Sequence, residues 1–206
     1  MDWKQVWNDK TQLDHPFYQM GRRDYSMFQF FLMCRDIATL LKFTPDDIVL
    51  DAGAGSGWTS FYVAPFVKEI TAFDFAENLV EIAKSAEPFY PNLRVFQDDL
   101  LTMSKVSDRK YTKVIAGGCP FQYLKDHDEV KAALTNIYNI MAYDGRLLIN
   151  HIPDETFKPE KSESLWFGRE ALVRLCRDIG FRICWIYSVN QILTQGRYTF
   201  DLVVVK

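Results

Sequence analysis

Short apolar segments alternate with helix-like segments along residues 48–152. Each apolar segment is too short to cross a membrane, and continuous apolar runs of this length are typical of strands buried on both faces of a parallel sheet. Helices between such strands indicate a doubly wound α/β fold. We therefore predict strands at 48–52, 69–75, 111–118 and 146–152, and a further strand within 92–100.

The segments between these strands carry apolar residues at helical spacing. In the segment 76–89, for example, Ala76, Leu79, Val80 and Ala83 fall on one face. A longer helix with a broad apolar face is expected before the first strand. The predicted helices are 24–43, 58–66, 76–89, 126–142 and 168–180.

After residue 180 the chain shows two strand-like segments, 181–189 and 197–206, with no helix between them. Such a pair is expected to lie antiparallel. The sequence shows no repeat and no boundary between domains. We therefore expect residues 1–206 to form one domain, with an N-terminal helical extension at 1–44 and the α/β core at 45–206.

The stretch VLDAGAGSGW places Gly53, Gly55 and Gly57 between the first strand and the following helix. Ligands of doubly wound sheets bind at this end of the strands, and glycine allows a close approach of the backbone. A dinucleotide loop needs a third glycine at the place of Trp58, which is far too large. Asp51 would also repel a pyrophosphate, whereas it suits a ligand with an ammonium or sulfonium group.

Acidic residues follow the next two strands as well. Asp74 lies at the predicted end of the second strand, where a carboxylate can accept both hydroxyls of a ribose. Asp98 and Asp99 follow the third strand, where a carboxylate can accept a hydrogen bond from an adenine amino group. Any one of these residues alone is more simply a helix cap or a turn residue. Three successive strand ends beside a glycine loop favour a nucleoside site.

Taken together, VLDAGAGSG, ITAFDFAENLVEIAK, VFQDDL and AYDGRLLI resemble the ordered motifs of class I S-adenosylmethionine-dependent methyltransferases, of the small-molecule type. The resemblance covers about residues 45–206. It implies a Rossmann-like, seven-stranded sheet that is mostly parallel with an antiparallel last strand, helices on both faces and an N-terminal helical lid. It also implies S-adenosylmethionine as the cofactor. The cofactor-binding residues implied within this region are Asp51, Gly53, Gly55, Gly57, Asp74, Phe75, Asp99, Leu100 and Gly117.

A general base for methyl transfer is expected at the ends of the fourth and fifth strands. His151 lies there and, as a histidine, titrates near neutral pH, although a packed histidine bonded to backbone is an alternative. His15, in the N-terminal segment, is a second candidate. Tyr25 and Arg22 could close over the cofactor together with Tyr18, Arg22 facing the cofactor carboxylate, or they could lie in solvent on a packed helix.

The fourth strand is followed by Gly118-Cys119-Pro120-Phe121. Methyltransferases that act on adenine or glutamine amino groups typically carry N/D-P-P-Y/F at this place. The departure argues against a nucleobase or protein-glutamine acceptor. Cys119 itself is predicted to be a small buried thiol rather than a nucleophile.

Composition excludes several classes of function. A net charge of −3 and the lack of a basic run argue against nucleic acid as the main partner. The four cysteines form no CxxC pair and the three histidines have no zinc-ligand spacing, so no metal is expected. No apolar run is long enough for a membrane span and the polar, aromatic residues 1–10 do not resemble a signal peptide, so we expect a cytoplasmic protein, monomeric or homodimeric.

The sequence therefore predicts a methyltransferase that modifies an oxygen or nitrogen atom of a small acceptor, such as a sugar, another metabolite or a natural-product intermediate. Two alternatives stay open. One is a partner subunit that binds the cofactor without catalysis, since no base is certain from the sequence. The other is an NAD-dependent oxidoreductase, against which Trp58 argues.

Overall fold

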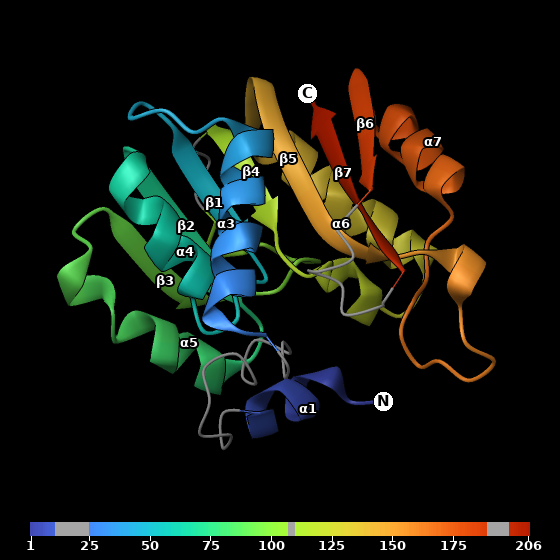
Figure 1. The fold of residues 1–206 in the computed structure, drawn as a ribbon, viewed down its shortest axis with the longest axis horizontal. Coiled ribbons are helices and arrows are strands. Elements are labelled where there is room, and N and C mark those ends of the chain that lie inside the picture. Colours follow the sequence, from blue (N-terminus) through green and yellow to red (C-terminus); the bar gives the residue numbers. More distant parts are fainter. Residues whose placement is uncertain (11–24, 107–109, 189–197) are drawn as a thin grey trace.

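The computed structural model describes residues 1–10, 25–106, 110–188 and 198–206. Within these residues the chain forms a seven-stranded sheet of order β3-β2-β1-β4-β5-β7-β6 (Figure 1). Neighbouring strands from β3 to β5 are parallel, and β7 is antiparallel to both β5 and β6. This confirms the predicted sheet. The strands are β1 (Ile48–Ala52), β2 (Glu69–Asp74), β3 (Leu93–Gln97), β4 (Tyr111–Ala116), β5 (Met141–Pro153), β6 (Ile183–Ser188) and β7 (Thr199–Val205).

Helices cover both faces of the sheet (Figure 1). Alternate residues of each strand point to opposite faces, so Val49 packs toward one helical layer and Leu50 toward the other. The first layer consists of α3, α4 and α5, and the second of α6 and α7. The bounds are α1 (Trp3–Asp9), α3 (Met27–Leu41), α4 (Trp58–Val63), α5 (Glu77–Lys84), α6 (His127–Ile140) and α7 (Arg169–Ile179).

Local signals set the helix ends. Ser26 and Gln29 form a capping box, so α3 begins at Met27, three residues before its first buried side chain, Phe30. The predicted apolar face of 76–89 is buried as expected, but α5 ends at Lys84 and a short 3-10 helix, η3 (Glu87–Phe89), follows with Pro88 inside it. Similar short 3-10 turns are η2 (Ala64–Phe66), η4 (Pro120–Tyr123) and η5 (Glu155–Phe157).

β5 is irregular at its carboxyl end. Its pairing with β7 shifts between Ile149 and Ile152, and His151, inside the shift, has a left-handed backbone with φ of 55°. A bulge of this kind bends a strand and re-aims the side chains within it. Asn150 and His151 are therefore presented at the end of the sheet where the first four strands also terminate.

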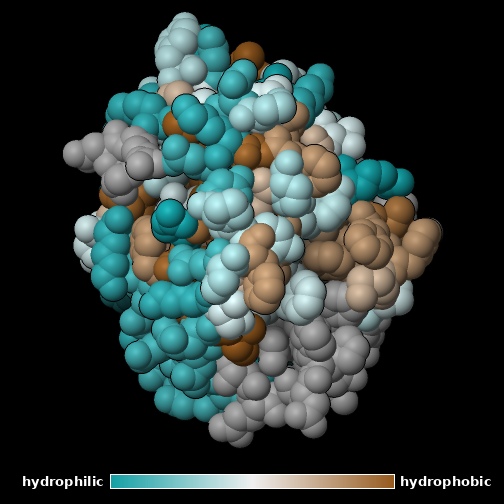
Figure 2. Space-filling view, turned by 90° about the vertical axis from the view of Figure 1, so that its left-hand side faces the viewer, coloured by the Kyte–Doolittle hydropathy of each residue, from teal (hydrophilic) through white to brown (hydrophobic). Residues whose placement is uncertain are grey.

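The N-terminal helix α1 lies beneath the carboxyl ends of the strands (Figure 1). On the outer surface, α3 leaves Met27, Phe28 and Phe31 more than half exposed. In Figure 2 most of the visible face is hydrophilic, with apolar atoms gathered toward one side, beside the grey atoms. Among the helices that the structure describes, none is long and apolar enough to cross a membrane.

Candidate cofactor and acceptor site

A cavity of about 720 Å³ lies at the carboxyl ends of the strands, between the sheet and α1. Its volume is within the usual range of pockets for small organic ligands. The order of the strands in the sheet divides the cavity wall into two halves. The turns after β3, β2, β1 and β4 form one half, and the ends of β5 and β7 with the segment 157–166 form the other. The residues predicted from sequence that line the cavity are Tyr25, Asp51, Gly53, Gly55, Asp74, Phe75, Asp99, Leu100, Gly117 and His151.

The glycine loop is held against the end of β2. The amide groups of Gly53 and Ala54 both donate to the Phe73 carbonyl, at 2.9 Å, and the Gly55 amide donates to Oδ2 of Asp74 at 2.8 Å. A Cβ on Gly53 would lie 2.7 Å from Cβ of Pro120, whereas a Cβ on Gly55 would meet no atom within 4 Å. Gly53 is thus needed for close packing, and Gly55 presents bare backbone to the cavity.

Gly57 is not part of the cavity wall, although the resemblance implies a place beside the cofactor for it. It has φ of 84° and directly precedes α4. A Cβ there would lie 2.8 Å from the Phe61 ring and 2.9 Å from Cβ of Ala83 on α5. Its role is to let α4 pack against α5.

Replacing Gly57 by alanine is expected to lower the free energy of unfolding by about 2–4 kcal/mol, because backbone strain and overpacking add. Gly55→Ala is the matched control. This variant carries a similar backbone strain, at φ of 57°, but its Cβ meets no other atom. Its free energy of unfolding should therefore fall by about 1 kcal/mol only. Urea unfolding of both variants measures the difference. Equal losses would contradict the packing role of Gly57.

Asp51 is 1% exposed, and its Oδ2 accepts a hydrogen bond from the Ser60 hydroxyl at 2.6 Å. Burial raises the pKa of this carboxyl to about 7, the Ser60 bond opposes the rise, and the nearby Asp74 adds to it. Burial likewise raises the pKa of Asp74 to about 6, although the amides of Ala76 and Gly55 donate to it. A buried cationic ligand would favour the ionised form of both groups.

Asp98 and Asp99 have different surroundings. Burial acts to raise the pKa of Asp98, but hydrogen bonds from the amides of Lys105, Asp99 and Ser104 outweigh it and lower the pKa. That carboxylate therefore organises the loop after β3. Asp99 is exposed to the cavity, and the bond that its side chain accepts within this loop is from the Leu101 amide. Both residues line the cavity, and the choice of Asp99 over Asp98 as the adenine ligand stays a prediction.

The turn after β4 is tied to β5. Oδ1 of Asn150 accepts the Gly118 amide at 2.6 Å, and a Cβ on Gly117 would be 3.9 Å from the same oxygen. Cys119 is buried, and its burial raises the pKa of the thiol far above the ordinary value. A thiol held in its neutral form is a poor nucleophile, in agreement with the prediction of a buried packing residue.

His151 projects from the bulge of β5 into the cavity. Its Nε2 is 3.4 Å from the Tyr25 hydroxyl, and its amide donates to Oδ1 of Asp201 on β7 at 2.7 Å. The Asp201 carboxylate thus holds the left-handed backbone of the bulge. Tyr25, assigned to the cofactor from the sequence, is placed beside the imidazole. An imidazole in this position can receive a proton from a ligand in the cavity.

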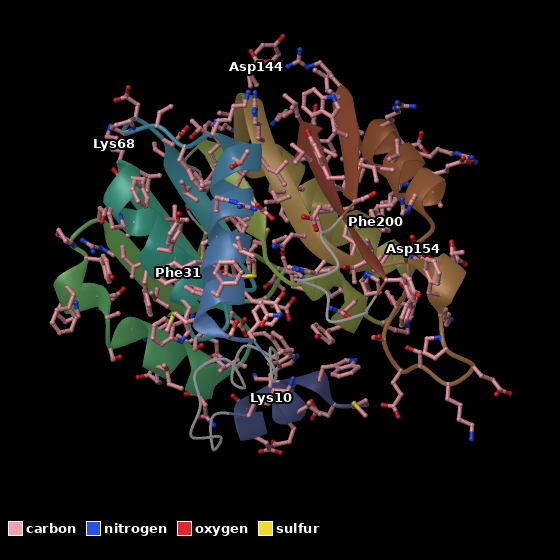
Figure 3. The ribbon with its side chains drawn as sticks, viewed as in Figure 1. Lys10, Phe31, Lys68, Asp144, Asp154 and Phe200 are labelled. Atoms are coloured by element: carbon pink, nitrogen blue, oxygen red, sulfur yellow. The ribbon has the colours of Figure 1, made fainter. Side chains whose placement is uncertain are left out.

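α1 closes the cavity from below. Trp3 and Trp7 pack against Tyr123, with ring centroids 4.7 and 5.4 Å apart from it, and Oδ1 of Asn8 accepts the amide of Asn78 on α5. Trp7 and Lys10 line the cavity. Figure 3 shows Lys10 below the strand ends. A helical lid is therefore present at 3–9, whereas His15, Tyr18 and Arg22 lie outside the described residues.

The described residues fit an adenosyl cofactor with a positively charged end. Gly55 offers bare backbone, Asp74 and Asp99 supply acceptors for hydroxyl and amino groups, and the buried Asp51 is held ready to ionise beside a cation. They do not fit a dinucleotide. Trp58 fills the place of the third glycine and packs edge-on against Phe30 of α3, at 6.4 Å.

A sequence model described as a methyltransferase domain matches residues 49–145. By this match and by its fold, the chain is similar to the class I S-adenosylmethionine-dependent methyltransferases. The matched part of this methyltransferase domain holds the glycine loop and the acidic ends of β1, β2 and β3, which form the first half of the cavity. His151 and the rest of the second half lie outside the match.

Known proteins similar to this methyltransferase domain differ in chemistry. The malonyl-[acyl-carrier protein] O-methyltransferase of Bacillus anthracis is 27% identical over 148 residues, which cover 70% of this chain and 51% of that protein. The chain thus spans about half the length of that relative.

Two solved structures share the fold at low sequence identity. The N-methyltransferase NodS of Bradyrhizobium japonicum, in complex with S-adenosyl-L-homocysteine, is similar at a TM-score of 0.76 and 15% identity, over 100% of this chain and 97% of that one. The [4+2]-cyclase SpnF is similar at a TM-score of 0.68 and 14% identity, over 85% and 80%. Because a cyclase shares the fold, the chemistry of the site has to decide the reaction.

Sequence reasoning missed Asn150, Asp201 and Trp7. Asn150 and Asp201 are buried polar residues in apolar strands, and that contrast was a usable signal in the sequence. Trp7 has an indole N–H that is buried, lies against the cavity and has no hydrogen-bond partner among the described residues. Nothing in the local pattern of residues 1–10 indicates that this helix folds under the sheet.

Proposed function

We propose that this protein is an enzyme that transfers a methyl group from S-adenosylmethionine to an oxygen or nitrogen atom of a small acceptor. The observation that carries the proposal is a single cavity with two unlike halves. One half is acidic and has bare backbone at its centre, and the other contains the imidazole of His151. Bound in the first half, the cofactor supplies a methyl group on a positively charged sulfur.

The residues of this chain then have three tasks. Asp51 and Asp74 hold the cofactor through its charge and its hydroxyl groups. α1 excludes water from below, and alignment of acceptor and methyl group supplies up to ~7–11 kcal/mol of the barrier reduction. His151 accepts the proton that the acceptor loses, while Tyr25 and Asp201 fix the imidazole and its backbone. Names of the relatives support both an oxygen and a nitrogen acceptor.

Calorimetric titration of the whole chain tests the cofactor. We expect S-adenosylmethionine and S-adenosyl-L-homocysteine to bind and NAD not to bind. Incubation with a methyl-labelled cofactor and a library of metabolites then tests catalysis. Transfer to a small acceptor supports the enzyme, whereas tight cofactor binding with no transfer to any compound would favour a non-catalytic partner subunit. Binding of NAD in preference to both methionine compounds would contradict the proposal.

Asp74→Ala is expected to weaken binding of S-adenosyl-L-homocysteine by roughly 1.5–3 kcal/mol, the cost of losing hydrogen bonds to a charged group. The substitution also removes the acceptor of the hydrogen bond that the Gly55 amide donates to Asp74. Asp144→Ala is the control, because Asp144 lies far along β5 at the opposite end of the sheet and is exposed. An unchanged dissociation constant for Asp74→Ala would make this residue a turn residue only.

The proposal extends to the setting of the enzyme. We propose a cytoplasmic protein, monomeric or homodimeric, that acts on a small molecule rather than on nucleic acid or a membrane. The four cysteines form no disulfide, which supports a reducing compartment. The net charge of −3 supports a small acceptor rather than a polyanionic partner such as nucleic acid.

A further inference from the structure

The half of the cavity beneath β5 and β7 differs in chemistry from the cofactor half. We propose that it binds a planar, uncharged aromatic acceptor, and that the atom methylated is a phenolic oxygen. This inference rests on the proposed methyl transfer and names the class of its acceptor. Figure 3 marks this part of the molecule by Asp154, just beyond the end of β5, and by Phe200 on β7.

Aromatic rings form the outer wall of this half. Phe157 and Tyr198 stack with ring centroids 3.8 Å apart and an interplanar angle of 14°, and both line the cavity. Trp166 lines it as well, and its indole N–H donates to the Ser162 hydroxyl at 2.7 Å, which fixes the ring. Fixed ring faces favour a flat ligand, which stacks on them at a low cost in entropy.

The charges of the cavity wall are confined to the other side. Among the described lining residues, the carboxylates are those of the cofactor half, and the one cation of that set is Lys10 on α1. Two buried carboxylates lie near the end of β5 but outside the cavity wall: Asp154 pairs with Arg169 at 2.8 Å, and Asp201 accepts the His151 amide at 2.7 Å. A charged acceptor would therefore lose its hydration at this wall without an opposite charge in return.

Besides Asn150, which accepts the Gly118 amide, and Ser164, which bonds to Ser162, two polar groups on β5 and β7 line this half. His151 supplies one, and the Thr199 hydroxyl supplies another, which is buried and has no hydrogen-bond partner in the described part of the chain. Thr199 pairs with Pro153, two residues beyond His151 along β5. Two strand residues span roughly 7 Å. This spacing suits an acceptor molecule whose hydroxyl donates a hydrogen bond to His151 and whose second polar group forms a hydrogen bond with Thr199.

The base also favours a phenol over a sugar. Imidazole titrates near pH 6.5 and a phenol near pH 10, whereas an aliphatic hydroxyl is a far weaker acid. In the proposed step the phenolic oxygen forms a bond to the methyl carbon and its proton passes to Nε2 of His151. The bond from methyl carbon to sulfur breaks, and its electron pair stays on the sulfur. Every atom and charge is then accounted for by phenol, cofactor and imidazole.

Binding is tested first, on the whole chain saturated with S-adenosyl-L-homocysteine. The probes are 2-naphthol, methyl glucoside and succinate. Their binding is measured by tryptophan fluorescence and by calorimetry. We expect 2-naphthol to bind at least tenfold more tightly than the other two. Tighter binding of the sugar or of the dicarboxylate would overturn the aromatic acceptor. Phenol binding without any methyl transfer would instead contradict the proposed function and leave the chemistry of the subsite intact.

Turnover with the methyl-labelled cofactor tests the contacts. Thr199→Val keeps the shape of the side chain and removes its hydroxyl, so we expect KM for 2,6-dihydroxynaphthalene to rise about five- to tenfold, with KM for 2-naphthol unchanged. Phe157→Ala should raise KM for both. Phe89→Ala, an exposed ring on η3, is the control and should change neither. Equal effects of Thr199→Val on the two naphthols, or none, would refute the role of its hydroxyl.

Discussion

His151→Asn is expected to lower kcat by roughly 10²–10⁴-fold, the usual contribution of a general base, and to leave cofactor affinity nearly unchanged. His151 lies on β5, apart from the acidic ends of β1, β2 and β3 that form the cofactor half of the cavity. Asparagine is the better replacement because residue 151 has φ of 55°, a conformation that asparagine adopts more readily than alanine. A loss of activity is then a loss of the imidazole rather than of the bulge.

His127→Asn is the matched control for this experiment. His127 begins α6, is exposed and packs its ring edge-on against Phe167, outside the cavity. Its substitution should leave kcat within about twofold. The pH profile adds a second readout, because the wild-type rate should fall as the imidazole becomes protonated and the asparagine variant should lack that step. A kcat of His151→Asn close to the wild-type value would remove this residue from the reaction.

Most of the fold was predictable because its signals are local. A buried parallel strand is a short apolar run, and polar residues or glycines mark the ends of the strands from β1 to β4. The start of β5 was not predictable in this way. The sequence AYDG predicts a turn, but the strand already begins at Met141 and passes through Asp144 with φ of 61°. The conformation of that segment is determined by pairing with neighbouring strands and not by its own residues.

The two halves of the cavity differ in the same way. Asp51, Asp74 and Asp99 lie at or just after the ends of three parallel strands, and parallel strands end at one edge, so their convergence follows from the chain order. Thr199 reaches the cavity, and Asp201 reaches the amide of His151, only because β7 is inserted antiparallel beside β5. Such placement is set by contacts between distant segments. The lid at 3–9 likewise depends on Tyr123, more than a hundred residues away.

The buried carboxyl of Asp51 is expected to make the stability of the ligand-free protein depend on pH. Its pKa is about 7 in the folded protein, well above the 3.8 that is usual for an aspartate. Between these values the folded state binds more protons than the unfolded state, so the contribution of this group to stability is lost as pH rises from about 4 to 7. Asp51→Asn should remove that part of the pH dependence, measured as the difference in unfolding free energy between variant and wild type.

Binding of S-adenosylmethionine should have the opposite pH dependence, with an effect comparable in size to that of His151→Asn. A ligand with a sulfonium and an ammonium group requires ionised carboxylates, and protonation weakens binding about tenfold per pH unit below each pKa. With pKa values of about 7 for Asp51 and about 6 for Asp74, affinity should fall by up to roughly 10³-fold between pH 7.5 and pH 5.

Calorimetry across that range measures the fall, with adenosine as the control ligand because it keeps the ribose and the adenine but carries neither charge. Its affinity should change far less with pH. In Asp51→Asn the affinity for S-adenosylmethionine should be low already at pH 7.5 and should fall by only about tenfold, the part due to Asp74. A parallel decline for adenosine and S-adenosylmethionine would mean that the carboxylates act on the nucleoside alone. The acidic half of the cavity would then have no selectivity for the charged sulfur, and alignment of the methyl group would depend on other contacts.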